Sequence, residues 1–150
     1  MRVVIQRVLN ASVTVEDKTV ASIDKGLLIL LGIVTDDTQE DITWLTSKVA
    51  NLRIFEDQNG VMNTSLLDIK GDAIVVSQFT LHASTKKGNR PSYIKAARPE
   101  VAVPIYEAFN ATLESILNKP IQTGVFGADM KVQLLNSGPV TIIIDSKNRE

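Results

Sequence analysis

Strand-like segments crowd the first 34 residues of this chain. Four runs are rich in Val, Ile and Leu: residues 2–9, 12–16, 19–24 and 27–34. Asn10-Ala11 and Asp17-Lys18 separate the first three runs, as tight turns do. The last run is short and apolar enough for a buried strand. The pattern therefore predicts a β-meander at the start of the chain.

Two helices are predicted to interrupt the strands. Apolar residues recur at helical spacing near 38–51, after a capping pattern formed by Asp37 and Glu40. A second helical pattern covers about 104–118. Pro99 and Pro104 leave its start ambiguous, because Pro104 suits a position in the first turn.

The remaining segments add strands in an order that is not a strict βαβ alternation. Residues 73–81 are β-prone and form a candidate central strand, and 131–136 and 140–145 form two more around Asn136-Ser137-Gly138-Pro139. A turn is expected at 57–60 and a long polar loop at 83–98. The chain is thus predicted to be α+β, with a mostly antiparallel or mixed sheet, or a barrel, and two main helices.

Composition limits the chemistry more than the fold. The 150 residues fit one domain, 1–150, and contain no cysteine and one histidine, His82. A disulfide framework, a zinc finger and a cysteine protease are therefore excluded, and no catalytic zinc site is expected, since such sites usually take several His or Cys ligands. We expect no metal and no cofactor. Charges at Arg2 and Arg7 interrupt the first apolar stretch, so no signal peptide or membrane span is expected and the cytoplasm is the expected location.

Polar side chains gather where the predicted central strand ends, in Ser77-Gln78-Phe79-Thr80-Leu81-His82. In an extended chain Ser77 and His82 lie on opposite faces. This argues against a nucleophile–base pair, although a small-ester serine hydrolase using these two residues stays an alternative. The plainer alternative is a strand that emerges into solvent, with His82 at the surface.

A cationic loop follows directly. Between Lys86 and Arg98 there are five basic residues and no acidic one, in a chain whose formal charge is −1. Lys86, Lys87 and Arg90 are candidates for binding phosphates, and Tyr93 for stacking on an unpaired base. The alternatives are a solvated loop and a non-catalytic RNA-binding dimer.

The two motifs Ser77-Gln78-Phe79-Thr80 and Asn136-Ser137-Gly138-Pro139-Val140-Thr141 make the chain resemble the D-aminoacyl-tRNA deacylases. They stand about sixty residues apart, in the family's order. Supporting segments are 87–93 and 126–130, and the resemblance extends over essentially the whole length.

The resemblance implies a deacylase-like fold and a homodimer with active sites at the subunit interface. The implied substrate is the 3′ acceptor end of aminoacyl-tRNA carrying a D-amino acid, or glycine mischarged onto alanine tRNA. Ser77, Gln78, Phe79 and Thr80 would line the scissile ester, and backbone N–H groups there could stabilise an oxyanion.

The resemblance also implies how chirality is read. Gly138-Pro139 would be a cis peptide that reaches into the partner's site, where its carbonyls hold the amino group and exclude an L side chain. The 2′-hydroxyl of the tRNA, rather than a protein base, would assist the attack. Three positions depart from the family pattern: Ser84 and Ser137 are often acidic in the family, and His82 is often aromatic. They bear on the electrostatics of the tRNA-facing rim.

Overall fold

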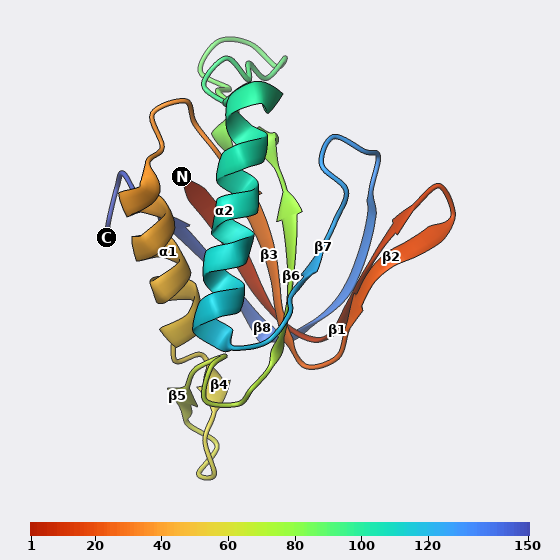
Figure 1. The fold of residues 1–150 in the computed structure, drawn as a ribbon, viewed down its shortest axis with the longest axis vertical. Helices are drawn as coiled ribbons and strands as arrows, with labels where there is room; N and C mark the ends of the chain where they lie inside the picture. Colours follow the sequence, from red (N-terminus) through yellow and green to blue (C-terminus); the bar gives the residue numbers. More distant parts are fainter.

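One mixed sheet organises the chain, and the computed structural model describes all 150 residues (Figure 1). Most of its strands run through β2–β1–β3–β6–β7, and β8 pairs with the other edge of β1. The strands are β1 (Arg2–Val15), β2 (Lys18–Ile23), β3 (Gly26–Gly32), β6 (Asp72–Ser77), β7 (Gln122–Thr123) and β8 (Lys131–Asp145). The pairing is antiparallel around β1 and parallel between β3, β6 and β7, which confirms a mixed sheet in an α+β fold.

The predicted meander is wrong, because β2 and β3 both pair with β1. The C-terminal part of β1 pairs with β2 and its N-terminal part pairs with β3, and both pairings are antiparallel. Asn10-Ala11 is not a turn. The strand runs through it, and the register against β8 shifts between Gln6 and Val8 and between Val8 and Asn10. Such irregularities bend a strand without ending it.

Two helices cover one face of the sheet (Figure 1): α1 (Gln39–Asn51) and α2 (Pro99–Leu117). The first was predicted correctly. The second begins earlier than 104, because Pro99 occupies the first helical position, where no N–H donor is needed. Pro104 lies inside the helix, where it lacks the N–H that would bond to the carbonyl of Glu100.

The main core lies between these helices and the sheet. Apolar side chains of β1, β3 and β6 pack there against Leu45 and Val49 of α1 and Phe109 and Leu113 of α2. A smaller core lies on the other face, where side chains of β1, β2, β3 and β6 pack together, among them Val8, Leu28 and Ile74. The sheet is therefore buried on both faces over part of its width.

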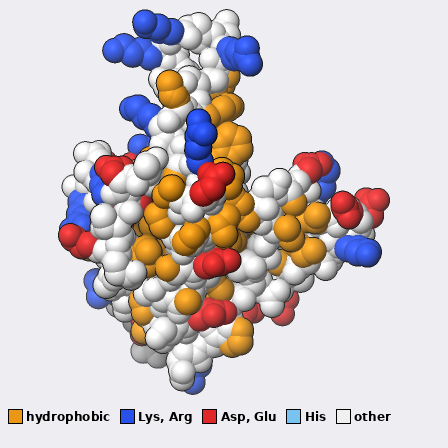
Figure 2. Space-filling model, turned by 45° about the horizontal axis from the view of Figure 1, so that its top comes forward, with side chains coloured by type: hydrophobic (Ala, Val, Ile, Leu, Met, Phe, Trp, Pro, Cys, Tyr) orange, Lys and Arg blue, Asp and Glu red, His pale blue; other side chains and the backbone are white.

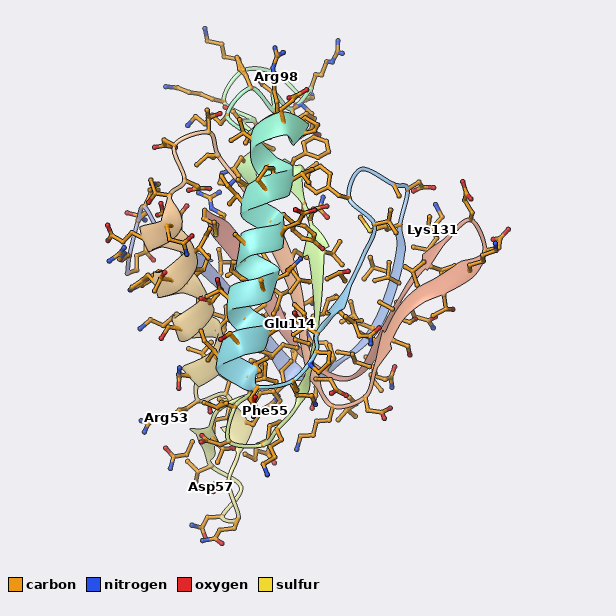
Figure 3. The ribbon with its side chains drawn as sticks, in the orientation of Figure 1. Arg53, Phe55, Asp57, Arg98, Glu114 and Lys131 are labelled. Carbon is orange, nitrogen blue, oxygen red and sulfur yellow. The ribbon has the colours of Figure 1, made fainter.

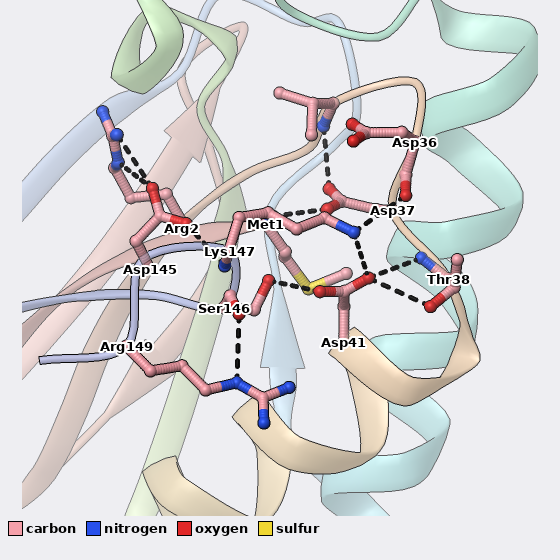
Figure 4. A network of polar contacts seen from close by, with 11 residues as sticks. Met1, Arg2, Asp36, Asp37, Thr38, Asp41, Asp145, Ser146, Lys147 and Arg149 are labelled. Carbon is pink, nitrogen blue, oxygen red and sulfur yellow. Dashed lines mark hydrogen bonds and ion pairs between the residues drawn. The ribbon is translucent and has the colours of Figure 1, made fainter.

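The start of α1 is tied to the end of the chain (Figure 4). The capping residues are Thr38 and Asp41 rather than Asp37 and Glu40, since the Thr38 N–H donates to Asp41 Oδ2 at 2.8 Å. Asp41 also accepts bonds from Ser146 Oγ and Lys147 Nζ. Burial alone would raise the pKa of Asp41, but the bonds from Lys147, Ser146 and Thr38 hold it well below its usual range.

Two small elements complete the fold. The hairpin β4 (Phe55–Glu56) and β5 (Met62–Thr64) turns at residues 57–60, as predicted, with Gly60 at φ +74°. The labelled Asp57 in this turn lies at the end of the molecule opposite Arg98 (Figure 3). The predicted strands 131–136 and 140–145 are one strand, β8, which passes through Gly138-Pro139 without a hairpin.

Candidate active site

The first motif lies where β6 ends. The predicted strand 73–81 stops at Ser77, and residues 79–82 form a single 3₁₀ turn, η1 (Phe79–His82). The last ladder partner is Leu31, whose carbonyl accepts the Gln78 N–H at 2.8 Å. A Cβ on Gly32 would lie 3.0 Å from Leu81 Cβ, so a glycine at the end of β3 lets η1 fold back closely.

Thr80 is held by its neighbour. Gln78 Nε2 donates to Thr80 Oγ1 at 2.5 Å. Because the hydroxyl oxygen accepts this bond, its own proton is free to be donated to a substrate oxygen. The alternating strand faces expected for residues 77–82 do not exist, since η1 is helical.

The structure does not assemble Ser77 and His82 as a nucleophile and base. The His82 side chain is buried rather than at the surface, and its Nε2 has no hydrogen-bond partner. Ser77 lies at the end of β6, before the turn. The sequence expectation of a surface histidine is therefore wrong, because η1 turns its last residue inward onto Gly32.

A cavity of about 300 Å³ opens beside the first motif. Its wall includes Ser77, Gln78 and Phe79 from the motif and Phe126 and Met130 from the segment before β8. The other lining residues are mostly small or apolar. A pocket lined in this way suits a mostly apolar group that carries a few polar atoms.

The cationic loop stands over this region. Ser84 and Ser92 exchange backbone hydrogen bonds at 2.8 and 2.9 Å and close its base. Lys86, Lys87 and Arg90 are exposed on the segment between them. Figure 2 shows the basic side chains gathered on this projection, with apolar side chains exposed below it.

Two exposed aromatic rings join the loop to the motif. Phe79 is 55% exposed, and its ring meets that of Tyr93 edge to face, with centroids 5.0 Å apart. Exposed rings of this kind are free to stack on unpaired bases.

The second motif does not meet the first within one chain. Ser77 pairs with Leu31, which is level with Val3 of β1 and Ile144 of β8. Gly138 lies several residues away along β8, and β8 is three strand spacings from β6. Standard strand spacings place the two motifs on the order of 20 Å apart.

A buried arginine supports the second motif. The Arg7 side chain donates to the Ser137 carbonyl from Nε at 3.0 Å and to the Ile54 carbonyl from Nη1 at 2.6 Å. The Gly138-Pro139 peptide is cis, and Gly138 has φ +125°. A Cβ on Gly138 would lie 2.8 Å from Arg7 Nη2, and this φ strains any L side chain, so a larger residue would force the turn or the guanidinium to shift.

Arg7 is the residue of this candidate site that sequence reasoning missed. It shares the strand face of Val3 and Ile5, both buried, and is itself 7% exposed. A cation at a core-facing position of an apolar strand is costly unless its donors are satisfied. A charged residue at this core-facing position of the sequence was therefore the signal that could have identified Arg7.

Comparison with solved structures identifies the fold. A structure titled "Structural Analysis of a probable eukaryotic D-amino acid tRNA deacylase" has the same fold at 17% identity, with a TM-score of 0.83 over 95% of this chain and 97% of that one. A second, "c-Myc DNA Unwinding Element Binding Protein", is 39% identical, with a TM-score of 0.92 over 97% and 98% of the two chains. This chain thus has the same fold as both of these proteins.

The family follows from the sequence matches. The family model described as D-Tyr-tRNA(Tyr) deacylase matches residues 4–145. Proteins named D-aminoacyl-tRNA deacylase are 68% identical in Flavobacterium psychrophilum and 62% identical in Parabacteroides distasonis, each over all of both chains. The chain therefore belongs to the D-Tyr-tRNA(Tyr) deacylase family, and it is a hydrolase that acts on the ester bond of D-aminoacyl-tRNA. No helix in the structure is long and apolar enough to cross a membrane.

Proposed function

We propose that this chain removes D-amino acids, and glycine mischarged onto alanine tRNA, from the terminal adenosine of tRNA in the cytoplasm. The observation that carries the proposal is the Thr80 hydroxyl, fixed by Gln78 directly after a cavity wall and below a cationic loop. The cavity takes the terminal base beside Phe79. The loop takes the phosphates of the acceptor end.

Each active site is proposed to be built by two copies of the chain. The two motifs are on the order of 20 Å apart in one chain, too far to contact one aminoacyl ester. A homodimer in which the second motif of one copy meets the first motif of the other removes this separation. Ser77, Gln78, Phe79 and Thr80 then come from one copy, and Gly138 and Pro139 from its partner.

Chirality is proposed to be read by backbone rather than by side chains. The carbonyls of Gly138 and Pro139 would accept hydrogen bonds from the substrate's amino group. Because Gly138 has no Cβ, the turn stays narrow. A D side chain then points into free space, whereas an L side chain meets the turn. Arg7 holds the Ser137 carbonyl and thereby positions this turn.

The attack on the ester is proposed to use the 2′-hydroxyl of the terminal ribose. The single histidine is buried, and its Nε2 bonds to nothing. Thr80 has a proton to donate, and backbone N–H groups near Phe79 can stabilise the developing oxyanion. The 2′-hydroxyl of the substrate then assists the attack in place of a protein base.

The direct test compares D-tyrosyl-tRNA with L-tyrosyl-tRNA, with release of free tyrosine as the readout. We expect multiple turnovers on the D substrate and a far lower rate on the L substrate. Equal rates would overturn chiral proofreading. Salt-sensitive binding of tRNA without turnover would instead favour the non-catalytic RNA-binding dimer.

A triple substitution, Lys86→Ala, Lys87→Ala and Arg90→Ala, tests the cationic loop. We expect KM to rise and kcat to hold, because the loop positions phosphates and does not touch the ester. Each lost phosphate contact lowers the slope of log K against log salt by about 0.7 to 0.9. The measurement is KM at several salt concentrations.

A matched control replaces Lys18 and Lys25, which are exposed but lie outside the loop. Its KM and salt slope should match those of the wild type. An equal loss in the control and the loop variant would mean that general charge, not this loop, attracts the tRNA.

A further inference from the structure

The only histidine occupies an unusual place in the motif. His82 is the last residue of η1, two residues after Thr80, and is 8% exposed. A Cβ on Gly32 would lie 3.0 Å from His82 Cδ2, so the imidazole is packed directly against the end of β3. The ring therefore has no room to move toward β3 while η1 keeps its place.

Charged groups surround this ring, and each already has a partner. Arg2 from β1 donates to the Leu81 carbonyl at 2.8 Å and is paired with Asp145 of β8. Asp37, in the turn before α1, is paired with the Met1 ammonium and accepts the Val34 N–H at 2.8 Å. Two cations and one engaged carboxylate thus face the imidazole, and Nε2 has no acceptor beside it.

We infer that His82 is a positioning residue for the deacylation, whose neutral, buried ring fixes η1 and whose protonation releases it. An imidazolium at this place would need a hydrogen-bond acceptor for its second N–H, and the positive charges of Arg2 and the Met1 ammonium would repel it. It is accommodated only if the ring turns outward, which carries Thr80 and Gln78 away from their positions. The inference rests on the proposed role of Thr80.

The direction of the titration agrees with this geometry. Burial lowers the pKa of His82 below 6.5, and the positive charges of Arg2 and the Met1 ammonium lower it further. A hydrogen bond with the Gly32 backbone opposes this by raising the pKa. The unfolded chain then binds the proton more readily than the folded chain. The contribution of the neutral ring to stability is complete above pH 6.5 and is lost as the pH falls toward the lower native pKa.

The first experiment uses the wild-type protein and proton NMR. A single histidine gives one imidazole C2–H resonance, so its titration needs no assignment by mutation. We expect a midpoint below 6.5, with the backbone amides of Phe79 and Thr80 shifting at the same midpoint. A midpoint at or above 6.5, or amides of η1 that do not follow it, would overturn the inference.

The second experiment compares His82→Gln with the wild type on D-tyrosyl-tRNA, from pH 8 down to one pH unit below the midpoint found by NMR, with circular dichroism at each pH. Glutamine keeps a polar side chain of similar reach but does not titrate. Once the pH is below the pKa of His82, the wild-type active fraction falls by about tenfold per pH unit. The ratio of the variant's kcat to that of the wild type should therefore rise in acid. A flat ratio would contradict the inference.

Two controls separate this inference from the proposed function. His82→Leu replaces the ring with an apolar side chain and should give the same rising ratio if His82→Gln folds poorly. Thr80→Ala should lose activity at every pH while its imidazole titrates as in the wild type. If Thr80→Ala keeps its activity and the wild type keeps its activity in acid, the proposed site is wrong. If Thr80→Ala loses its activity but the wild type keeps its activity in acid, only the proposed role of His82 is wrong.

Discussion

Replacing Gly138 with alanine is expected to reduce kcat/KM on D-tyrosyl-tRNA by about 10- to 100-fold. The new Cβ would lie 2.8 Å from Arg7 Nη2, and a φ of +125° is strained for any L side chain. Such a conformation costs about 1–3 kcal/mol, so the turn shifts to relieve it. The shifted carbonyls no longer fit the amino group. The ratio of D to L rates should fall together with the D rate.

Gly60→Ala is the matched control for this substitution. Gly60 also has positive φ, +74°, but a Cβ there would meet nothing within 4 Å. Its turn lies at the end of the molecule opposite Arg98 and the cationic loop (Figure 3). Gly60→Ala should lower the thermal midpoint without changing the D or L rate. If Gly138→Ala also loses only stability, the turn has no part in reading the substrate.

The second large effect concerns the substrate. D-tyrosyl-tRNA that ends in 2′-deoxyadenosine should be hydrolysed about 10²-fold more slowly or worse, the range over which a well-placed acid–base group acts. The protein has no free imidazole to replace the missing hydroxyl, since His82 is buried. The measurement is single-turnover release of tyrosine from the two substrates.

Binding must be measured beside the rate. The deoxy substrate should compete for the wild-type enzyme about as well as the normal one, because one hydroxyl is a small part of the tRNA surface. Thr80→Ala supplies the opposite case. If that variant is inactive while the deoxy substrate reacts normally, the key hydroxyl comes from the protein and the proposed mechanism is wrong.

Local patterns in the sequence were sufficient for the helix at 39–51 and the turn at 57–60. Both depend on neighbours close in the chain: apolar spacing in the first, and in the second the Asp57 carboxylate, which accepts the Asn59 N–H, and the positive φ of Gly60. The meander failed because strand pairing is a long-range property. Residues 10 and 11 look like a turn locally, yet both pair with β8, which follows more than a hundred residues later.

The candidate site shows the same division. Polar residues at the end of an apolar strand marked the first motif, but only the packing of η1 on Gly32 reveals which side chains turn inward. The burial of His82 and the bonds of Arg7 to two carbonyls each depend on segments distant in sequence. The sequence alone could show that Arg7 is a charged residue at a core-facing position, but it could not predict which carbonyls Arg7 binds.

The distance between the two motifs has a genetic meaning. If one copy supplies Thr80 and the other supplies Gly138, a copy damaged at Thr80 and a copy damaged at Gly138 can still build one complete site between them. The other site of that pair carries both lesions. Two null alleles of a single gene would thus complement each other, and selection would act on the pair of chains.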